Sequence, residues 1–253
     1  IGSGMGGSTL AWALKDSGLD VLVAERGHFL PREPENSQPA EMYIKGRYKN
    51  AGHWYDGSNG KPFAPGVYYW VGGNTRFYGA MLPRFRRSDF TEVRHQEGTS
   101  RAWPFRYDDL EPYYCRIERL LDVHGSVGED PTEGRRSAPY PWPAVSHEPR
   151  IQQMVDDLFA AGYHPFHAPC GVLLDEEDRN RSQCLRCSWC DGYPCLVHAK
   201  SDAETMAVRP VLGLPNVTLL TGAEATRLAT DPSGRRVTTV HVTVDIVPVQ
   251  GTR

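Results

Sequence analysis

Residues 1–7, Ile-Gly-Ser-Gly-Met-Gly-Gly, contain three glycines in the pattern G-x-G-x-x-G and are the most informative stretch for the fold. Such glycines allow a tight turn and let the backbone approach a pyrophosphate closely. A helix that starts there would offer its free N–H groups and the positive end of its dipole to the anion. The stretch therefore predicts a dinucleotide-binding turn, and the alternative is a glycine-rich surface turn before an ordinary core helix.

The residues that follow supply the context that this motif needs. Apolar residues at helical spacing occupy positions 10–14, and Gly18 predicts the end of that helix. Residues 21–24, Val-Leu-Val-Ala, are typical of a short buried parallel strand. Glu25 ends this strand, where a carboxylate accepts hydrogen bonds from ribose hydroxyls. We expect a βαβ unit whose first strand would precede Ile1, and we interpret the chain as a fragment.

Composition narrows the class of protein. The chain has 253 residues, 40% hydrophobic and 23% charged, which is typical of a globular protein and excludes wholesale disorder. A formal net charge of -3 gives no reason to expect nucleic acid or an anionic membrane as a partner. No run approaches the ~18 apolar residues of a membrane-spanning helix. We therefore expect no membrane span and a cytoplasmic location.

Further elements are expected along the chain. Residues 31–66 lack a sustained period, which is typical of a covering loop or lid. Two more helices are predicted at 108–121 and 151–161, each with apolar residues three to four positions apart. Strands are predicted at 216–221 and from 236 onward, where the alternating pattern runs to 249, with a turn at 231–234.

A second glycine segment, Gly72-Gly73-Asn74-Thr75, follows an aromatic run. The first motif does not separate FAD from NAD, but a flavin needs a long channel lined by backbone. This segment could pass close to a flavin, where a side chain would clash. Taken alone, such a segment is more often a simple turn.

Three segments resemble the glucose–methanol–choline oxidoreductase family. Residues 71–84 are similar to its second flavin-contacting signature, 103–118 to the helix after that signature, and 216–225 to the return into the flavin domain. The resemblance implies an α/β fold, with an incomplete Rossmann-like FAD-binding domain and the start of a mixed α+β substrate domain. It implies these cofactor-binding residues: Gly2, Gly4, Gly7, Glu25, Arg26, Gly72, Gly73, Asn74, Thr75, Gly79 and Ala225.

The resemblance also implies a domain order and an activity. Residues 1–120 and 196–253 would belong to the FAD-binding domain, and residues 121–195 would enter the substrate domain. FAD would accept hydride at N5 from the CH–OH group of an alcohol or sugar while a base takes the hydroxyl proton, and an external acceptor would reoxidise it.

The family's catalytic histidine lies beyond the point at which this chain stops, so no catalytic residue is assigned. His53, His164 and His167 are expected to be surface or structural. Phe77 stands where one branch of the family carries a flavin-linked histidine, which implies non-covalent FAD.

Four cysteines fall within twelve residues: Cys184, Cys187, Cys190 and Cys195. Their C-x2-C-x2-C-x4-C spacing is near that of ferredoxin runs, and it also suits zinc with His198 as a substitute ligand. We predict that these cysteines bind a metal. The most specific form of this hypothesis is an iron–sulfur cluster that relays electrons. A reduced or disulfide-bonded structural loop is the alternative.

Two rival functions remain open on the sequence alone. An NAD(P)-dependent Rossmann dehydrogenase would share the glycine motif, but it would not explain residues 68–84 or 216–225. A non-enzymatic metal-binding module built on the cysteines would contain metal without flavin.

Overall fold

A computed structural model of the chain describes residues 1–50 and 52–245. It divides into two compact units. Unit 1 comprises Ile1–Gly79, Cys187–His198 and Asp202–Arg253 as far as it is described, and unit 2 comprises Ala80–Arg186 and Ala199–Ser201. The first change of unit lies before the predicted boundary at 120. These units are defined by compactness, and the functional division at 120 and 195 stays a prediction.

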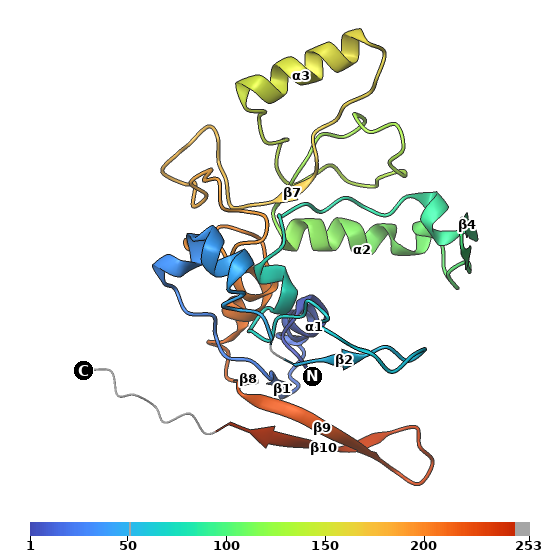
Figure 1. Cartoon of the computed structure of the whole chain (residues 1–253), viewed down its shortest axis with the longest axis vertical. Helices are drawn as coiled ribbons and strands as arrows, with labels where there is room; N and C mark the ends of the chain where they lie inside the picture. The colour runs from blue at the N-terminus through green and yellow to red at the C-terminus, as the bar shows by residue number, and fades with distance from the viewer. Residues whose placement is uncertain (51, 246–253) are drawn as a thin grey trace. The chain divides into compact units, whose positions relative to one another are not determined.

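Unit 1 contains the predicted nucleotide-binding elements (Figure 1). Helix α1 (Met5–Leu14) leads to strand β1 (Val21–Ala24), which pairs in parallel with β8 (Val217–Leu220). The register aligns Val21 with Val217 and Ala24 with Leu220. The helix and both strands were predicted from their local patterns, and the structure confirms them.

The chain leaves β8 for a long antiparallel hairpin of β9 (Ala223–Thr230) and β10 (Val237–Val244), seen at the base of Figure 1. The predicted turn is present, because Gly234 has a φ of 71° and its N–H donates to the carbonyl of Asp231. Residues 246–249 of the predicted strand lie outside the described residues.

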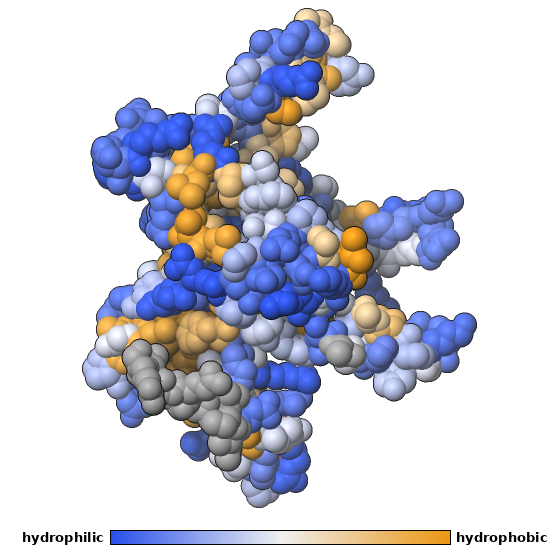
Figure 2. All heavy atoms as spheres, turned by 60° about the vertical axis from the view of Figure 1, so that its left-hand side comes forward, coloured by the Kyte–Doolittle hydropathy of each residue, from blue (hydrophilic) through white to orange (hydrophobic). Residues whose placement is uncertain are grey.

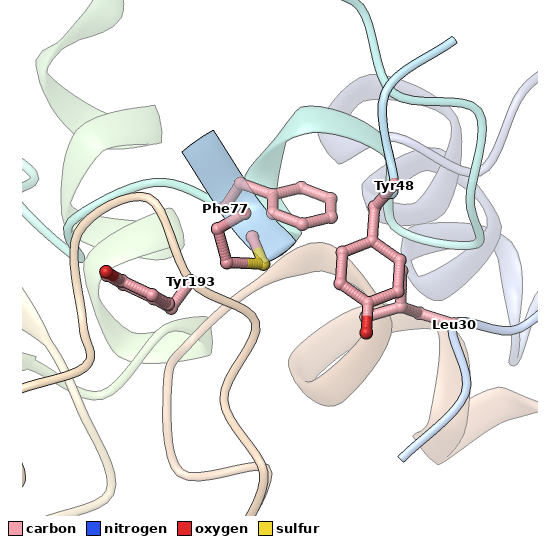
Figure 3. Packing of buried hydrophobic residues seen from close by; sticks show 5 residues of the cluster. Leu30, Tyr48, Phe77 and Tyr193 are labelled. Atoms are coloured by element: carbon pink, nitrogen blue, oxygen red, sulfur yellow. The ribbon is translucent and has the colours of Figure 1, made fainter. Parts of the chain in front are cut away.

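The covering segment 31–66 is more ordered than its pattern indicates. It forms a 3₁₀ turn at Pro34–Ser37, a π-type turn at Ala40–Ile44 and a small hairpin of β2 (Trp54–Tyr55) and β3 (Pro62–Phe63). Figure 3 shows how it is anchored, with Leu30 and Tyr48 near Phe77 and Tyr193. Met42 completes this buried cluster, so the covering segment shares one core with Phe77, two residues after the second glycine segment.

Unit 2 contains the other two α-helices and two strand pairings. Its elements are β4 (Val93–His95) paired with β5 (Gly98–Ser100), α2 (Tyr107–Leu120), β6 (Val123–His124) paired with β7 (Cys170–Gly171), and α3 (Pro149–Ala160). Both helices lie where they were predicted. Helix α2 buries polar residues, with Glu111 and Glu118 inside. Helix α3 has no buried residue, and its apolar stripe is only partly covered.

Apolar side chains also reach the surface elsewhere. Leu22 is 64% exposed and Ile44 is 84% exposed, and Figure 2 shows several apolar patches in orange on the face that it draws. Exposed apolar surface therefore does not by itself locate a site in this chain. No helix among the described residues has the length and apolarity needed to cross a membrane.

Candidate nucleotide-binding site

The site begins at the N-terminus of α1. Gly4 caps the helix in an extended conformation without a side-chain hydrogen bond, and the first turn has no acidic residue. Its N–H groups therefore face a space where an anion is favoured by both hydrogen bonding and the helix dipole. A Cβ at Gly7 would lie 2.0 Å from the carbonyl oxygen of Gly2, so the third glycine is required by close packing of helix and loop.

Glu25 is held at the end of β1, where it is 6% exposed. Its Oε2 accepts hydrogen bonds from the N–H and the hydroxyl of Ser3, both at 2.7 Å. Its Oε1 accepts one from the N–H of Gly27, also at 2.7 Å. Because each carboxylate oxygen has two lone pairs, Oε1 keeps the capacity to accept from a ribose hydroxyl.

The second glycine segment meets the first at Ser3. The N–H of Gly72 donates to the Ser3 hydroxyl at 3.1 Å, and a Cβ at Gly73 would lie 3.5 Å from the Cα of Gly4. Gly72 and Gly73 have φ values of 91° and 58°, in the left-handed region that favours glycine. The two glycine segments thus form one backbone cradle.

A third segment closes the site. The N–H of Ala223 donates to the carbonyl of Glu25 at 2.8 Å, which sets 223–225 beside the end of β1. The Arg26 guanidinium lies 4.1 Å from the ring centre of Tyr69 and 3.2 Å from Glu224. Arg26 is therefore held by stacking and by an ion pair at the rim of the site.

These segments enclose an open cavity of about 280 Å³. Five of the predicted cofactor residues line it: Gly2, Glu25, Arg26, Gly73 and Ala225. A second cavity, of about 320 Å³, shares Arg26, Tyr69 and Glu224 with it. Burial raises the pKa of Tyr68, which lines the first cavity, so its hydroxyl stays protonated at neutral pH.

Comparison with known proteins agrees with this geometry. Residues 1–61 match the family described as "NAD(P)-binding Rossmann-like domain". Paromamine 6'-oxidase of Streptomyces fradiae is 35% identical over 234 residues, which are 91% of this chain and 41% of that protein. The 6'''-hydroxyparomomycin C oxidase of Streptomyces lividus is 33% identical over 237 residues, which are 92% and 42% of the two chains.

A flavoprotein is also among the relatives. The gluconate 2-dehydrogenase flavoprotein of Pantoea cypripedii is 23% identical over 286 residues, covering 95% of this chain and 46% of that one. The names of these relatives agree with the predicted resemblance to the glucose–methanol–choline oxidoreductases. It spans less than half the length of each of these relatives.

A solved structure shares the fold of this chain. Pyridoxine 4-oxidase from Mesorbium loti superposes with a TM-score of 0.54 at 18% identity, covering 96% of this chain and 45% of that one. The predicted fold class, a Rossmann-like α/β domain followed by mixed α and β structure, is confirmed.

The other predicted cofactor residues shape the cradle rather than line the cavity. Gly4 and Gly7 form the loop and the first turn of α1. Asn74 Oδ1 accepts from the N–H of Tyr68 at 2.9 Å, and Thr75 Oγ1 donates to the carbonyl of Gly72 at 2.6 Å. Gly79 lies against Asp191, whose Oδ1 would be 3.0 Å from an added Cβ.

Phe77 occupies the position that suggested non-covalent flavin. It is buried in the core cluster of Figure 3, and its ring stacks on that of Tyr68 with 3.9 Å between the ring centres. The histidines expected to be surface or structural occupy such places. His53 and His164 are exposed, and His167 Nδ1 lies 2.8 Å from Glu129.

Several residues beneath the cradle escaped the sequence reasoning. Ser3 occupies a variable position of the glycine motif, yet it is fully buried. Arg76 lies 2.6 Å from Asp202 and 3.0 Å from Glu204, and all three are at most 1% exposed. Acidic residues inside the otherwise small and apolar stretch 202–208 were the available signal, because buried carboxylates need a cationic partner.

The metal prediction for Cys184, Cys187, Cys190 and Cys195 is not supported. Among residues 1–50 and 52–245, no three or more Cys, His, Asp or Glu side chains form a group that could hold a metal ion. Cys184, Cys190 and Cys195 are partly exposed, and Cys187 is exposed. Spacing in sequence alone does not establish a metal site, because the ligand atoms must also meet at one point.

Proposed function

We propose that this chain is the FAD-binding part of an enzyme that oxidises the CH–OH group of an alcohol or sugar. The observation that carries the proposal is the cavity where Glu25, the N-terminal loop of α1 and residues 223–225 meet. The names of the relatives, two oxidases and a dehydrogenase flavoprotein, support the same chemistry.

The residues present fit the adenosine diphosphate half of FAD. The uncapped N-terminus of α1 suits the pyrophosphate, and the remaining lone pair of Glu25 Oε1 suits a ribose hydroxyl. Ala225 and the Arg26–Tyr69 stack provide backbone and flat surfaces for the adenine. When bound, FAD supplies the electron acceptor of the oxidation, and these residues bind and orient it.

The direct test is titration of the chain with FAD, followed by flavin fluorescence. We expect saturable binding by the unmodified chain and about tenfold to a hundredfold weaker binding by Glu25→Gln, since hydrogen bonds to a charged group are lost. Asp16→Asn, which removes an exposed carboxylate that lines neither cavity, is the control and should bind within about threefold of the unmodified chain. Equal affinities for FAD in all three proteins would reject the proposed site.

The nicotinamide alternative rests on the description of the family matched by residues 1–61. Titration with NAD and NADP under the same conditions separates the two. Tighter binding of either nucleotide than of FAD would replace the flavin proposal.

We also propose that the flavin is non-covalent, because Phe77 cannot form a bond to it. Acid precipitation of the flavin-loaded protein should leave the yellow colour in the supernatant, and a yellow pellet would contradict this. We assign no catalytic residue here, so the chain alone should not reduce an acceptor dye with alcohols or sugars. Paromamine is a rational member of the substrate panel, given the name of a relative.

A further inference from the structure

Ser3 connects the two glycine segments through one hydroxyl group. The hydroxyl donates to Glu25 Oε2 at 2.7 Å and accepts from the N–H of Gly72 at 3.1 Å. Its own N–H also donates to Glu25. Ser3 is 0% exposed, so water does not compete for these bonds.

The connection continues beyond the second glycine segment. The carbonyl of Gly72 accepts from Thr75 Oγ1 at 2.6 Å, and Thr75 Oγ1 accepts from the N–H of Ala203 at 3.0 Å. A chain of hydrogen bonds therefore runs from Glu25 through Ser3 and Gly72 to the buried segment that begins at Asp202. Each member fixes the orientation of the next, because donor and acceptor roles are set along the chain.

We infer that Ser3 is a positioning residue that holds the ribose-binding carboxylate and the Gly72–Gly73 turn in one register, so that a single FAD molecule can engage both. The inference rests on the proposed function. It gives Ser3 a role in choosing the whole dinucleotide over its adenosine diphosphate half, because we expect the flavin half to depend on the Gly72–Gly73 turn more than ADP does, although Gly73 also lines the cavity.

Removal of the hydroxyl should affect the two ends unequally. In Ser3→Ala, Glu25 keeps the N–H donors of Ser3 and Gly27, whereas the buried N–H of Gly72 loses its acceptor. A buried donor without an acceptor is costly, so the turn at Gly72 shifts to find one. Binding of FAD should therefore weaken more than binding of ADP.

Ser8 provides a matched control in the same segment. It is 1% exposed, and its hydroxyl donates to the carbonyls of Gly4 and Met5 within its own helix turn. Ser8→Ala removes the same atom from a similarly buried position without touching Glu25 or Gly72.

The experiment measures dissociation constants for FAD and ADP with the unmodified chain, Ser3→Ala and Ser8→Ala. We expect Ser3→Ala to weaken FAD about tenfold to a hundredfold and ADP by less than about threefold, while Ser8→Ala changes both by less than about threefold. Equal weakening of FAD and ADP by Ser3→Ala, or equal effects of the two substitutions, would overturn the inference.

Two further outcomes are distinguishable. If the unmodified chain fails to bind FAD, the proposed function fails and the inference falls with it. If Ser3→Ala does not fold, Ser3→Cys keeps the size and a weaker hydrogen-bonding group, and it should show the same preferential loss of FAD at a smaller factor. A Ser3→Cys protein that binds FAD and ADP in the unmodified ratio would count against the inference.

Discussion

Glu25 in unit 1 and Glu118 in unit 2 are almost equally buried, at 6% and 4% exposure, but their surroundings differ. The three donors to Glu25 are uncharged groups of Ser3 and Gly27. Glu118 accepts four hydrogen bonds from the guanidinium groups of Arg84 and Arg136, two on each oxygen. Glu118 is thus saturated by the protein, whereas Glu25 borders a cavity with a lone pair to spare. Burial alone does not identify a binding carboxylate, but unused hydrogen-bonding capacity beside open space does.

The largest effect on the free energy of unfolding is expected at Glu118. We expect Glu118→Ala to lower the free energy of unfolding by about 3–5 kcal/mol, because it strands two buried guanidinium groups. Urea denaturation measures the change. A loss below about 1 kcal/mol would mean that Glu111 and Glu133 satisfy the arginines by themselves.

The next largest effect is expected in the glycine loop. The methyl group of Gly7→Ala would collide with the Gly2 carbonyl, and such overpacking costs about 1–3 kcal/mol, so FAD affinity should fall up to about a hundredfold. Gly6→Ala is the control, since an added Cβ there meets nothing within 4 Å. Similar FAD affinities for the two variants would show that the loop relaxes freely.

The two units should also respond to different pH windows. Burial, reinforced by Arg209, lowers the pKa of His198 in unit 1 to about 4. The unfolded chain protonates this histidine near pH 6.5, so the stability it contributes is full above that pH and falls as the pH drops toward 4. We expect a change on the order of 1 kcal/mol after solvent screening, and His198→Gln should flatten the profile in this window.

Glu111 in unit 2 acts at lower pH. Burial raises its pKa, but hydrogen bonds from Cys115 and Ser137 outweigh burial and lower the pKa to about 2. Its contribution is therefore present above about pH 4.5 and is lost as the pH falls toward 2. Urea titrations from pH 7 to pH 3 of the unmodified chain and Glu111→Gln measure this. Parallel profiles below pH 4.5 would contradict it.

The smallest effect is expected at the exposed Arg87–Asp108 pair, whose side chains are 54% and 61% accessible. Asp108→Asn should change the free energy of unfolding by less than about 0.5 kcal/mol. This variant also controls for the removal of a carboxylate in Glu118→Ala. If it lowered the free energy of unfolding as much as Glu118→Ala does, burial of the ion pair would not explain the difference.

Local patterns in the sequence were sufficient for the elements that carry the site. The glycine spacing, the run at 21–24 and the turn at 231–234 each depend on residues close in sequence, and α1, β1 and the turn before β10 follow from them. Strand β9 was not predicted. Glu25 and Ala225 line one cavity. A local pattern pointed to Glu25, whereas only the family resemblance pointed to Ala225.

The remainder depends on contacts between distant residues. Ser3 and Gly72 are 69 residues apart, and Arg76 and Asp202 are 126 apart. Local periodicity in the sequence therefore cannot predict either contact. Helical spacing predicted an apolar stripe on α3, but spacing cannot say whether a partner covers it, and none of its residues is buried. The metal prediction for the cysteine loop is unsupported for a related reason, since proximity in sequence does not fix the direction of each thiol.

The parallel pairing of β1 with β8 has a consequence for synthesis. Asn216, just before β8, donates its side-chain amide to the carbonyl of Leu19, 197 residues earlier in the chain. The glycine loop and β1 therefore leave the ribosome long before the strand that pairs with β1 exists. Until then the edge of β1 is open to other partners, and pairing over such a separation is slow because loop closure comes first. Efficient production should depend on protecting nascent chains during that interval, through chaperones or a lowered rate of expression.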